Sequence, residues 1–174
     1  RPEAGYLLYY GRIHPDKGAK EAVEIARKAG KRLVMAGIIQ DEAYFNRWVR
    51  PYLKEGQIDY IGSIGPEQRN ELLGNAVVLL HPIHFSEPFG LSVVEAMACG
   101  TPVIAFRKGS MPELITDKVD GFLVGNAEEA VERIGQLGRI DRQACRKTVA
   151  ERFTKEQMAA HYLQVYEQIL HLSS

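Results

Sequence analysis

The chain has 174 residues, of which 45% are hydrophobic, and its 22 acidic and 22 basic side chains give a formal net charge of zero. This length supports one domain with a sizeable core and is short for two. The charge balance argues against nucleic acid or an anionic membrane as the general partner. No apolar run approaches the ~20 residues that span a bilayer and no leader opens the chain, so we expect a soluble, cytoplasmic domain without a transmembrane segment.

Short apolar runs alternate with segments of helical periodicity along the whole chain, and such runs are typical of strands buried on both faces. The predicted strands are residues 6–13, 32–37, 58–61, 77–82, 102–106 and 121–124. The predicted helices are residues 19–29, 42–54, 66–74, 89–99, 111–116, 127–137, 142–153 and 155–170. Repeated strand-helix-strand units imply right-handed crossovers, and so predict an α/β fold with an open, six-stranded parallel sheet and helices on both faces.

In such sheets ligands bind beyond the carboxyl ends of the strands, where the loops into the following helices converge. We therefore expect the chemistry of this chain in four loops. These loops are residues 11–18, 62–66, 83–90 and 107–112.

The first of these loops reads GRIHPDKG and enters the first predicted helix. It contains neither a G-x-G-x-x-G fingerprint nor a Walker loop. It does place Arg12 and Lys17 beside the amino end of a helix, where free N–H groups and the helix dipole favour an anion such as a phosphate. Taken alone, the loop is more simply explained as a solvated basic surface.

The predicted helix 89–99 has the composition of a fully buried element, yet it contains Glu95, and Glu87 lies eight residues earlier. An ionised carboxylate in apolar surroundings needs a partner. On this helix Glu95 would lie beside the strand ends, where it could accept hydrogen bonds from a vicinal diol such as a ribose. Ser92 would share its face, and Gly90 would let a ligand approach the backbone. The alternatives are an ion pair between Glu95 and an Arg or Lys, and an exposed loop charge at Glu87.

Three motifs in this order resemble the retaining glycosyltransferases of family 4. The run EPFGLSVVEAMACGTPVIA at residues 87–105 resembles their E-x7-E signature, and Gly11-Arg12 with Lys17-Gly18 resembles their G-R…K-G phosphate loop. The run GSMPE at residues 109–113 resembles their G-G-x-P-E turn, with serine in place of the second glycine. The resemblance extends from about residue 6 to 170. It implies a Rossmann-like three-layer domain spanning residues 1–174, the C-terminal, donor-binding half of a GT-B enzyme whose N-terminal acceptor domain is absent from the chain.

The resemblance also implies roles for individual residues. Arg12 and Lys17 would hold the diphosphate of a nucleotide-sugar, and Glu87 would contact the transferred sugar, which makes these three the expected catalytic residues. Glu95 would accept the ribose hydroxyls. The other donor-binding residues implied are Gly11, Ile64, Phe89, Gly90, Leu91 and Ser92, with Ile64 in the segment that would meet the base.

No metal and no cofactor are expected beside the substrate, a UDP- or GDP-linked sugar. The chain has no D-x-D pattern, and the cations with the helix amino end would stabilise the leaving diphosphate instead. His81 and His84 are three residues apart near a strand end, a spacing that points them to opposite faces and argues against a metal pair unless the chain turns at Pro82. Cys99 and Cys145 are expected to be reduced thiols.

By the same resemblance the parent enzyme would transfer a sugar to an acceptor hydroxyl with retention of anomeric configuration, and this chain alone would be inactive. A nucleotide-sugar epimerase of the same architecture and a non-catalytic nucleotide-binding module are the alternatives from other classes. Contact of the full-length enzyme with a membrane surface stays open, as do the identities of the sugar, the base and the acceptor.

Overall fold

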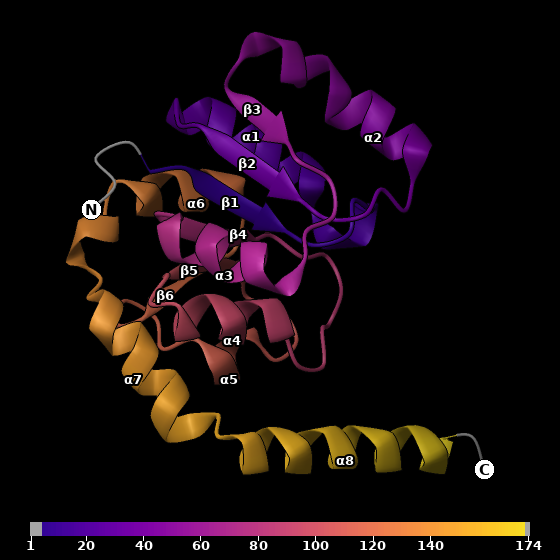
Figure 1. Ribbon diagram of the computed structural model, residues 1–174, viewed down its shortest axis with the longest axis vertical. Coiled ribbons are helices and arrows are strands. Elements are labelled where there is room, and N and C mark those ends of the chain that lie inside the picture. Colours follow the sequence, from indigo (N-terminus) through magenta and orange to yellow (C-terminus); the bar gives the residue numbers. More distant parts are fainter. Residues whose placement is uncertain (1–4, 173–174) are drawn as a thin grey trace.

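The computed structural model describes residues 5–172 and has three layers, with one sheet between two layers of helices (Figure 1). Its six strands are all parallel, in the order β3-β2-β1-β4-β5-β6. The strands are β1 (Leu7–Tyr10), β2 (Leu33–Ala36), β3 (Ile58–Tyr60), β4 (Val78–His81), β5 (Val103–Phe106) and β6 (Gly121–Val124). The predicted fold class, an open six-stranded parallel sheet, is therefore confirmed.

The order of the strands reverses in the middle of the sheet. From β1 the chain steps outward to β2 and β3, then returns to place β4 on the other side of β1, where Leu7 pairs with both Leu33 and Val78. In open α/β sheets such a reversal leaves a crevice at the carboxyl ends of the two strands, because their following loops part in opposite directions. The fold thus predicts a ligand site beyond Tyr10 and His81.

Helices cover both faces of the sheet. Helix α1 packs beside α6 on one face, while α3, α4 and α7 lie together on the other, and α8 runs along the lower edge of Figure 1, away from the sheet. The α-helices are α1 (Ala19–Ala29), α2 (Glu42–Trp48), α3 (Pro66–Asn75), α4 (Leu91–Ala98), α5 (Met111–Leu114), α6 (Ala127–Ile134), α7 (Arg142–Arg152) and α8 (Lys155–Leu172). Three 3-10 helices are η1 (Pro15–Lys17), η2 (Arg50–Glu55) and η3 (Leu137–Arg139). Within the described part of the chain, no helix combines the length and apolar character needed to cross a bilayer.

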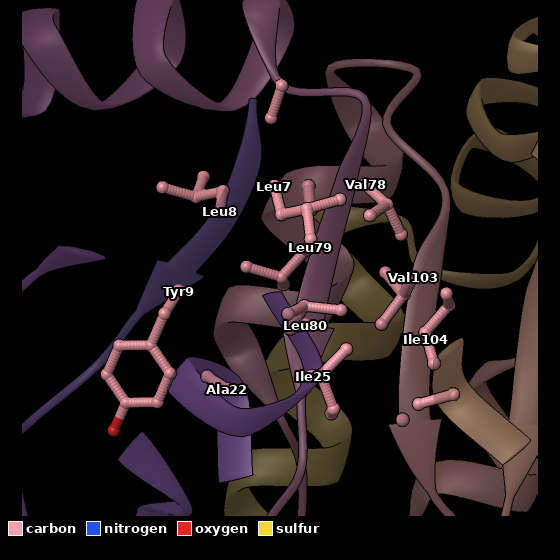
Figure 2. Packing of buried hydrophobic residues seen from close by; sticks show 14 of the residues in the cluster. Leu7, Leu8, Tyr9, Ala22, Ile25, Val78, Leu79, Leu80, Val103 and Ile104 are labelled. Atoms are coloured by element: carbon pink, nitrogen blue, oxygen red, sulfur yellow. The ribbon is translucent and has the colours of Figure 1, made fainter. Parts of the chain in front are cut away.

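The core is built on the central strands. Figure 2 shows the aliphatic side chains of β1, β4 and β5 packed together, with Ala22 and Ile25 of α1 against them. Four polar side chains are buried among the described residues, and two of them hold loops, since Thr101 donates to the Leu73 carbonyl and Asp120 accepts from the Thr116 amide. The other two, His81 and Ser110, lie beside the site described below.

Several predicted boundaries were wrong for identifiable reasons. The predicted helix 42–54 ends at Trp48 and continues as the 3-10 helix η2, because Pro51 has no N–H and disfavours helical backbone in the residue before it. The predicted helix 89–99 begins only at Leu91, since Gly90 has φ +73°, outside the right-handed helical region. The predicted strand 6–13 pairs as a ladder only over Leu7–Tyr10.

Candidate nucleotide-sugar site

A cleft of about 290 Å³ opens at the reversal of the sheet. It is lined by Tyr9, Tyr10, Gly11, Arg12, Lys17, Arg69, Leu80, His81, Glu87, Leu91, Ser92 and Glu95. Seven of the ten residues predicted for the site are in this set, and they come from three parts of the chain: the loop after β1, which includes η1, the loop after β4, and helix α4. The crevice expected from the strand order therefore coincides with the cleft that gathers the predicted residues.

The loop after β1 is packed tightly against the end of β4. Gly18, at the junction of η1 and α1, has φ +73°, and a Cβ there would stand 1.9 Å from the carbonyl oxygen of Pro82. Only glycine allows this approach without displacing backbone. The contact brings Lys17 into the cleft, where its Nζ lies 3.1 Å from Oε1 of Glu87 and 4.8 Å from the centre of the Phe85 ring.

Glu87 is bound through both of its carboxylate oxygens. Oε1 contacts Lys17, and Oε2 lies 2.6 Å from Nε2 of His81. The Glu87 side chain is only 14% exposed, so it is not the solvated loop charge that was its alternative. Burial by itself would raise the pKa of Glu87, but the hydrogen bond and charge of His81, together with Lys17, outweigh burial and lower the pKa to about 2. The carboxylate is therefore ionised at neutral pH.

Arg12 differs from Lys17 in having no carboxylate partner within the described residues. Its backbone is fixed, because the Tyr9 hydroxyl donates to the Arg12 carbonyl at 2.6 Å. Its exposed guanidinium donates from Nη1 to the neutral Oε1 of Gln40 at 2.8 Å. Within the described residues no carboxylate compensates the positive charge of Arg12, which favours the binding of an anion in the cleft.

Helix α4 points its amino end at the cleft and carries Glu95 in its second turn. Leu91 and Ser92 are the first two helical residues, whose N–H groups have no acceptor within a helix. Glu95 has a protein partner, Arg69 of α3, with Nη1 at 3.5 Å from Oε1. Both side chains are partly exposed, and burial raises the pKa of Glu95 more than Arg69 lowers it. The ion-pair alternative is therefore real in the structure, but the pair does not fully compensate the carboxylate.

Three predicted residues do not line the cleft. Ile64 borders a separate hollow of about 420 Å³ beside α3, together with Gln68 and Glu71 among others. Phe89 is half-buried and packs against the core. Gly90 caps α4, and a Cβ there would lie 2.6 Å from the Met111 side chain and 3.8 Å from Oε2 of Glu87, so a larger residue would crowd the packing beside the cleft.

The turn after β5 packs against the backbone of Glu87. Gly109 has φ +55°, and a Cβ there would lie 2.5 Å from the Glu87 nitrogen, while the Ser110 amide donates to the Glu87 carbonyl at 3.0 Å. Ser110 itself has an ordinary right-handed backbone with φ −76°. Replacement of the second glycine of the G-G-x-P-E pattern by serine therefore needs no unusual conformation, because only the first position is left-handed.

The two histidines and Arg69 show what the sequence did and did not reveal. His81 pairs with Glu87, whereas His84 pairs with Glu21 at 2.9 Å. Within the described residues no group of three metal-ligating side chains is assembled. His81 was missed as a site residue, although a polar residue at the end of a buried strand was a signal. Arg69 had no such signal, because its place in the cleft depends on how α3 packs beside α4.

The arrangement suits a ligand that combines an anion with several hydroxyl groups. The uncompensated Arg12, Lys17 and the amino end of α4 can stabilise negative charge. Glu87 and Glu95 are carboxylates that accept hydrogen bonds from hydroxyl groups.

Comparison with known proteins agrees with this description. A relative, a D-inositol 3-phosphate glycosyltransferase of Mycobacterium marinum, is 33% identical over 71% of this chain and 28% of its own length. The crystal structure of AviGT4, a glycosyltransferase involved in avilamycin A biosynthesis, superposes with a TM-score of 0.76 at 28% identity, covering 96% of this chain and 52% of AviGT4. The C-terminal domain of LpcC, a group 1 glycosyl transferase from Francisella tularensis, superposes with a TM-score of 0.72 at 25% identity, covering 86% of this chain and 87% of that domain.

This chain spans about half of AviGT4 and less of the Mycobacterium relative. The sequence model of the glycosyl transferases group 1 family matches residues 1–152. On that match, and with its Rossmann-like sheet shared with known GT-B glycosyltransferases, the chain belongs to the group 1 glycosyltransferase family.

Proposed function

We propose that this chain is the donor-binding domain of a retaining, metal-independent glycosyltransferase that moves a sugar from a nucleoside-diphosphate-sugar to an acceptor hydroxyl. One observation carries the proposal. An uncompensated Arg12, the amino end of α4 and the poorly compensated Glu95 meet in one cleft at the strand reversal. That combination offers separate partners for a diphosphate and for a ribose.

The cleft allows the donor to be placed residue by residue. The diphosphate would lie between Arg12 and the first N–H groups of α4, with Lys17 on its other side. The ribose hydroxyls would donate to Glu95, and the sugar hydroxyls to Glu87. Since Lys17 and Glu87 are already 3.1 Å apart, the diphosphate and the sugar would meet at this pair, where the bond to be broken would lie.

Transfer breaks the bond between the anomeric carbon and the diphosphate oxygen, and the electron pair of that bond stays on the diphosphate. Cations and N–H groups already oriented toward that oxygen stabilise the growing charge, a role filled elsewhere by a metal ion. The acceptor hydroxyl oxygen then forms the new bond on the face that the diphosphate leaves, and its proton passes to the departing phosphate. We assign no protein nucleophile.

The acceptor would be bound outside this chain. Known relatives extend over about twice its length or more, and a domain of its size in LpcC is described as C-terminal. The remaining half would supply an N-terminal acceptor domain, so this chain alone would bind the donor without transferring the sugar. A soluble, cytoplasmic location fits a nucleotide-sugar substrate.

Isothermal titration of this chain with UDP, GDP and their glucose, mannose and N-acetylglucosamine conjugates tests the proposal. We expect one nucleotide to bind, and its affinity to be unchanged by excess EDTA. Loss of binding with EDTA would contradict metal independence, and sugar epimerisation without acceptor would favour the epimerase alternative. Absence of binding to every nucleotide would overturn the proposed function.

A further inference from the structure

His81 is a buried polar side chain in a strand whose other residues are aliphatic. It is the last residue of β4 and is 6% exposed, while Val78, Leu79 and Leu80 before it are fully apolar. A polar side chain in such a position is costly unless it is hydrogen-bonded. Its partner is Oε2 of Glu87, at 2.6 Å.

The chemistry of this pair fixes which atom carries the proton. A carboxylate that is ionised at neutral pH can only accept a hydrogen bond, so Nε2 of His81 must be protonated and donate. The distance of 2.6 Å is short even for a hydrogen bond from N–H to a carboxylate, a class of bond that is among the strong ones. An Nε2–H donor exists in a neutral imidazole tautomer as well as in imidazolium, so the bond to Glu87 needs no positive charge on the ring.

The pair also fixes the orientation of Glu87. The carbonyl of Glu87 is held by the Ser110 amide, and its two carboxylate oxygens are held separately by Lys17 and His81. Lys17 lies in the connection between β1 and α1, whereas His81 is the last residue of β4, a central strand of the sheet. Of the two side-chain anchors of Glu87, His81 is therefore the more rigidly placed one.

We propose that His81 is a positioning residue for the transferred sugar: it orients the Glu87 carboxylate, through an Nε2–H donor, to receive the sugar hydroxyls. This inference rests on the proposed function and deepens it. His81 need not touch the donor itself. The other charged or titratable side chains that line the cleft are Tyr9, Tyr10, Arg12, Lys17, Arg69 and Glu95, and of these Lys17 is the one bound to Glu87.

Two conservative variants separate positioning from packing. In His81→Gln the side-chain amide nitrogen can occupy nearly the place of Nε2 and still donate to Glu87. In His81→Asn an amide of the same chemistry is one methylene shorter and cannot reach. Both variants place a similar polar group in the core, so a purely structural role predicts that they behave alike.

The measurement is the ratio of affinities for the nucleoside-diphosphate-sugar and the bare nucleoside diphosphate. We expect His81→Asn to lower this ratio by about tenfold, roughly the value of one hydrogen bond to a charged group, and His81→Gln to restore most of it. An unchanged ratio in His81→Asn, or an equal fall in both variants, would overturn the inference.

A second measurement uses the wild-type chain and needs no variant. Two-dimensional 1H–15N spectra of the histidine side chains distinguish the two neutral tautomers. We expect His81 to be protonated at Nε2, and an Nδ1–H tautomer with bare Nε2 would overturn the inference even if the variants fail to fold. A wild-type chain that binds no nucleotide overturns the proposed function and this inference with it, whereas wild-type binding with an unchanged ratio in His81→Asn overturns only the inference.

Discussion

Replacement of Glu95 by glutamine separates a ligand-binding carboxylate from a structural one. The Glu95–Arg69 pair is 3.5 Å long and partly exposed at both ends, so removing its charge should cost only about 0–1 kcal/mol. A second effect on stability acts in the opposite direction, because burial raises the pKa of Glu95 and so disfavours its ionised form. An acid with a raised pKa in the folded state stabilises the fold below its ordinary pKa, and this contribution is lost as the pH rises through the folded-state pKa. At pH 7 the ionised Glu95 is therefore a net cost to the fold.

Glu95→Gln at pH 7 should therefore leave the stability of the fold unchanged or raise it, so the melting temperature should stay level or rise. Nucleotide affinity should move the other way. Loss of hydrogen bonds to a charged acceptor costs about 1.5–3 kcal/mol, or roughly 10- to 150-fold in Kd.

Thermal unfolding and calorimetric titration of the same preparation provide both numbers. Glu132→Gln is the matched control, because it removes the same charge from an exposed position on α6 outside the cleft. The reasoning is refuted if Glu95→Gln lowers the melting temperature relative to Glu132→Gln while affinity per folded molecule stays at the wild-type value. Glu95 would then be a structural ion-pair partner, and the ribose assignment would be wrong.

Three further predictions concern the rest of the cleft. Because the pKa of Glu87 is lowered from 4.5 to about 2, its ionised form contributes up to about 3 kcal/mol to the stability of the fold above pH 4.5, and this contribution is lost as the pH falls towards 2. In urea unfolding, Glu87→Gln should therefore be less stable than wild type at pH 7, and the two stabilities should converge near pH 2. A constant difference in stability across this pH range would contradict the prediction. Arg12→Met should weaken nucleoside diphosphate binding at least tenfold by titration with little change in melting temperature, since its charge has no carboxylate partner in the described residues; equal affinity would remove Arg12 from the site. Gly18→Ala should lower the melting temperature more than Gly56→Ala does. Both glycines have φ near +75°, but of the two only Gly18 has backbone within 2 Å of the added Cβ. Equal falls in melting temperature would show that the loop can move away from Pro82.

Much of the fold could be predicted because each buried strand is a short apolar run between helical segments. The errors lie where one residue changed the local backbone. Pro51 divides a continuous helical pattern into α2 and η2, and Gly90 delays the start of α4. Periodicity reports which face of an element is apolar, but it does not report where a single dihedral angle ends that element.

The site was predictable to the extent that strand order determines it. The loops after β1 and β4 both border the crevice at the strand reversal, and this places Arg12, Lys17 and Glu87 in one cleft. The pairing of Arg69 with Glu95 depends on how two helices pack, and the placement of Ile64 in a separate hollow depends on the path of one loop. Neither follows from spacing in the sequence, because both are decided by contacts between elements far apart in the chain.

The pairing of β1 with β4 has a consequence for how the domain folds. Lys17 and Glu87 are 70 residues apart in the chain, and β2 and β3 must be built in the interval that separates them. No stretch of chain that stops short of β4 can form the cleft. A nucleotide bound there would therefore stabilise only molecules in which β1 and β4 have already paired. Ligand should therefore slow unfolding of the whole domain and protect amides of β2 and β6 alike from hydrogen exchange, although neither strand lines the cleft.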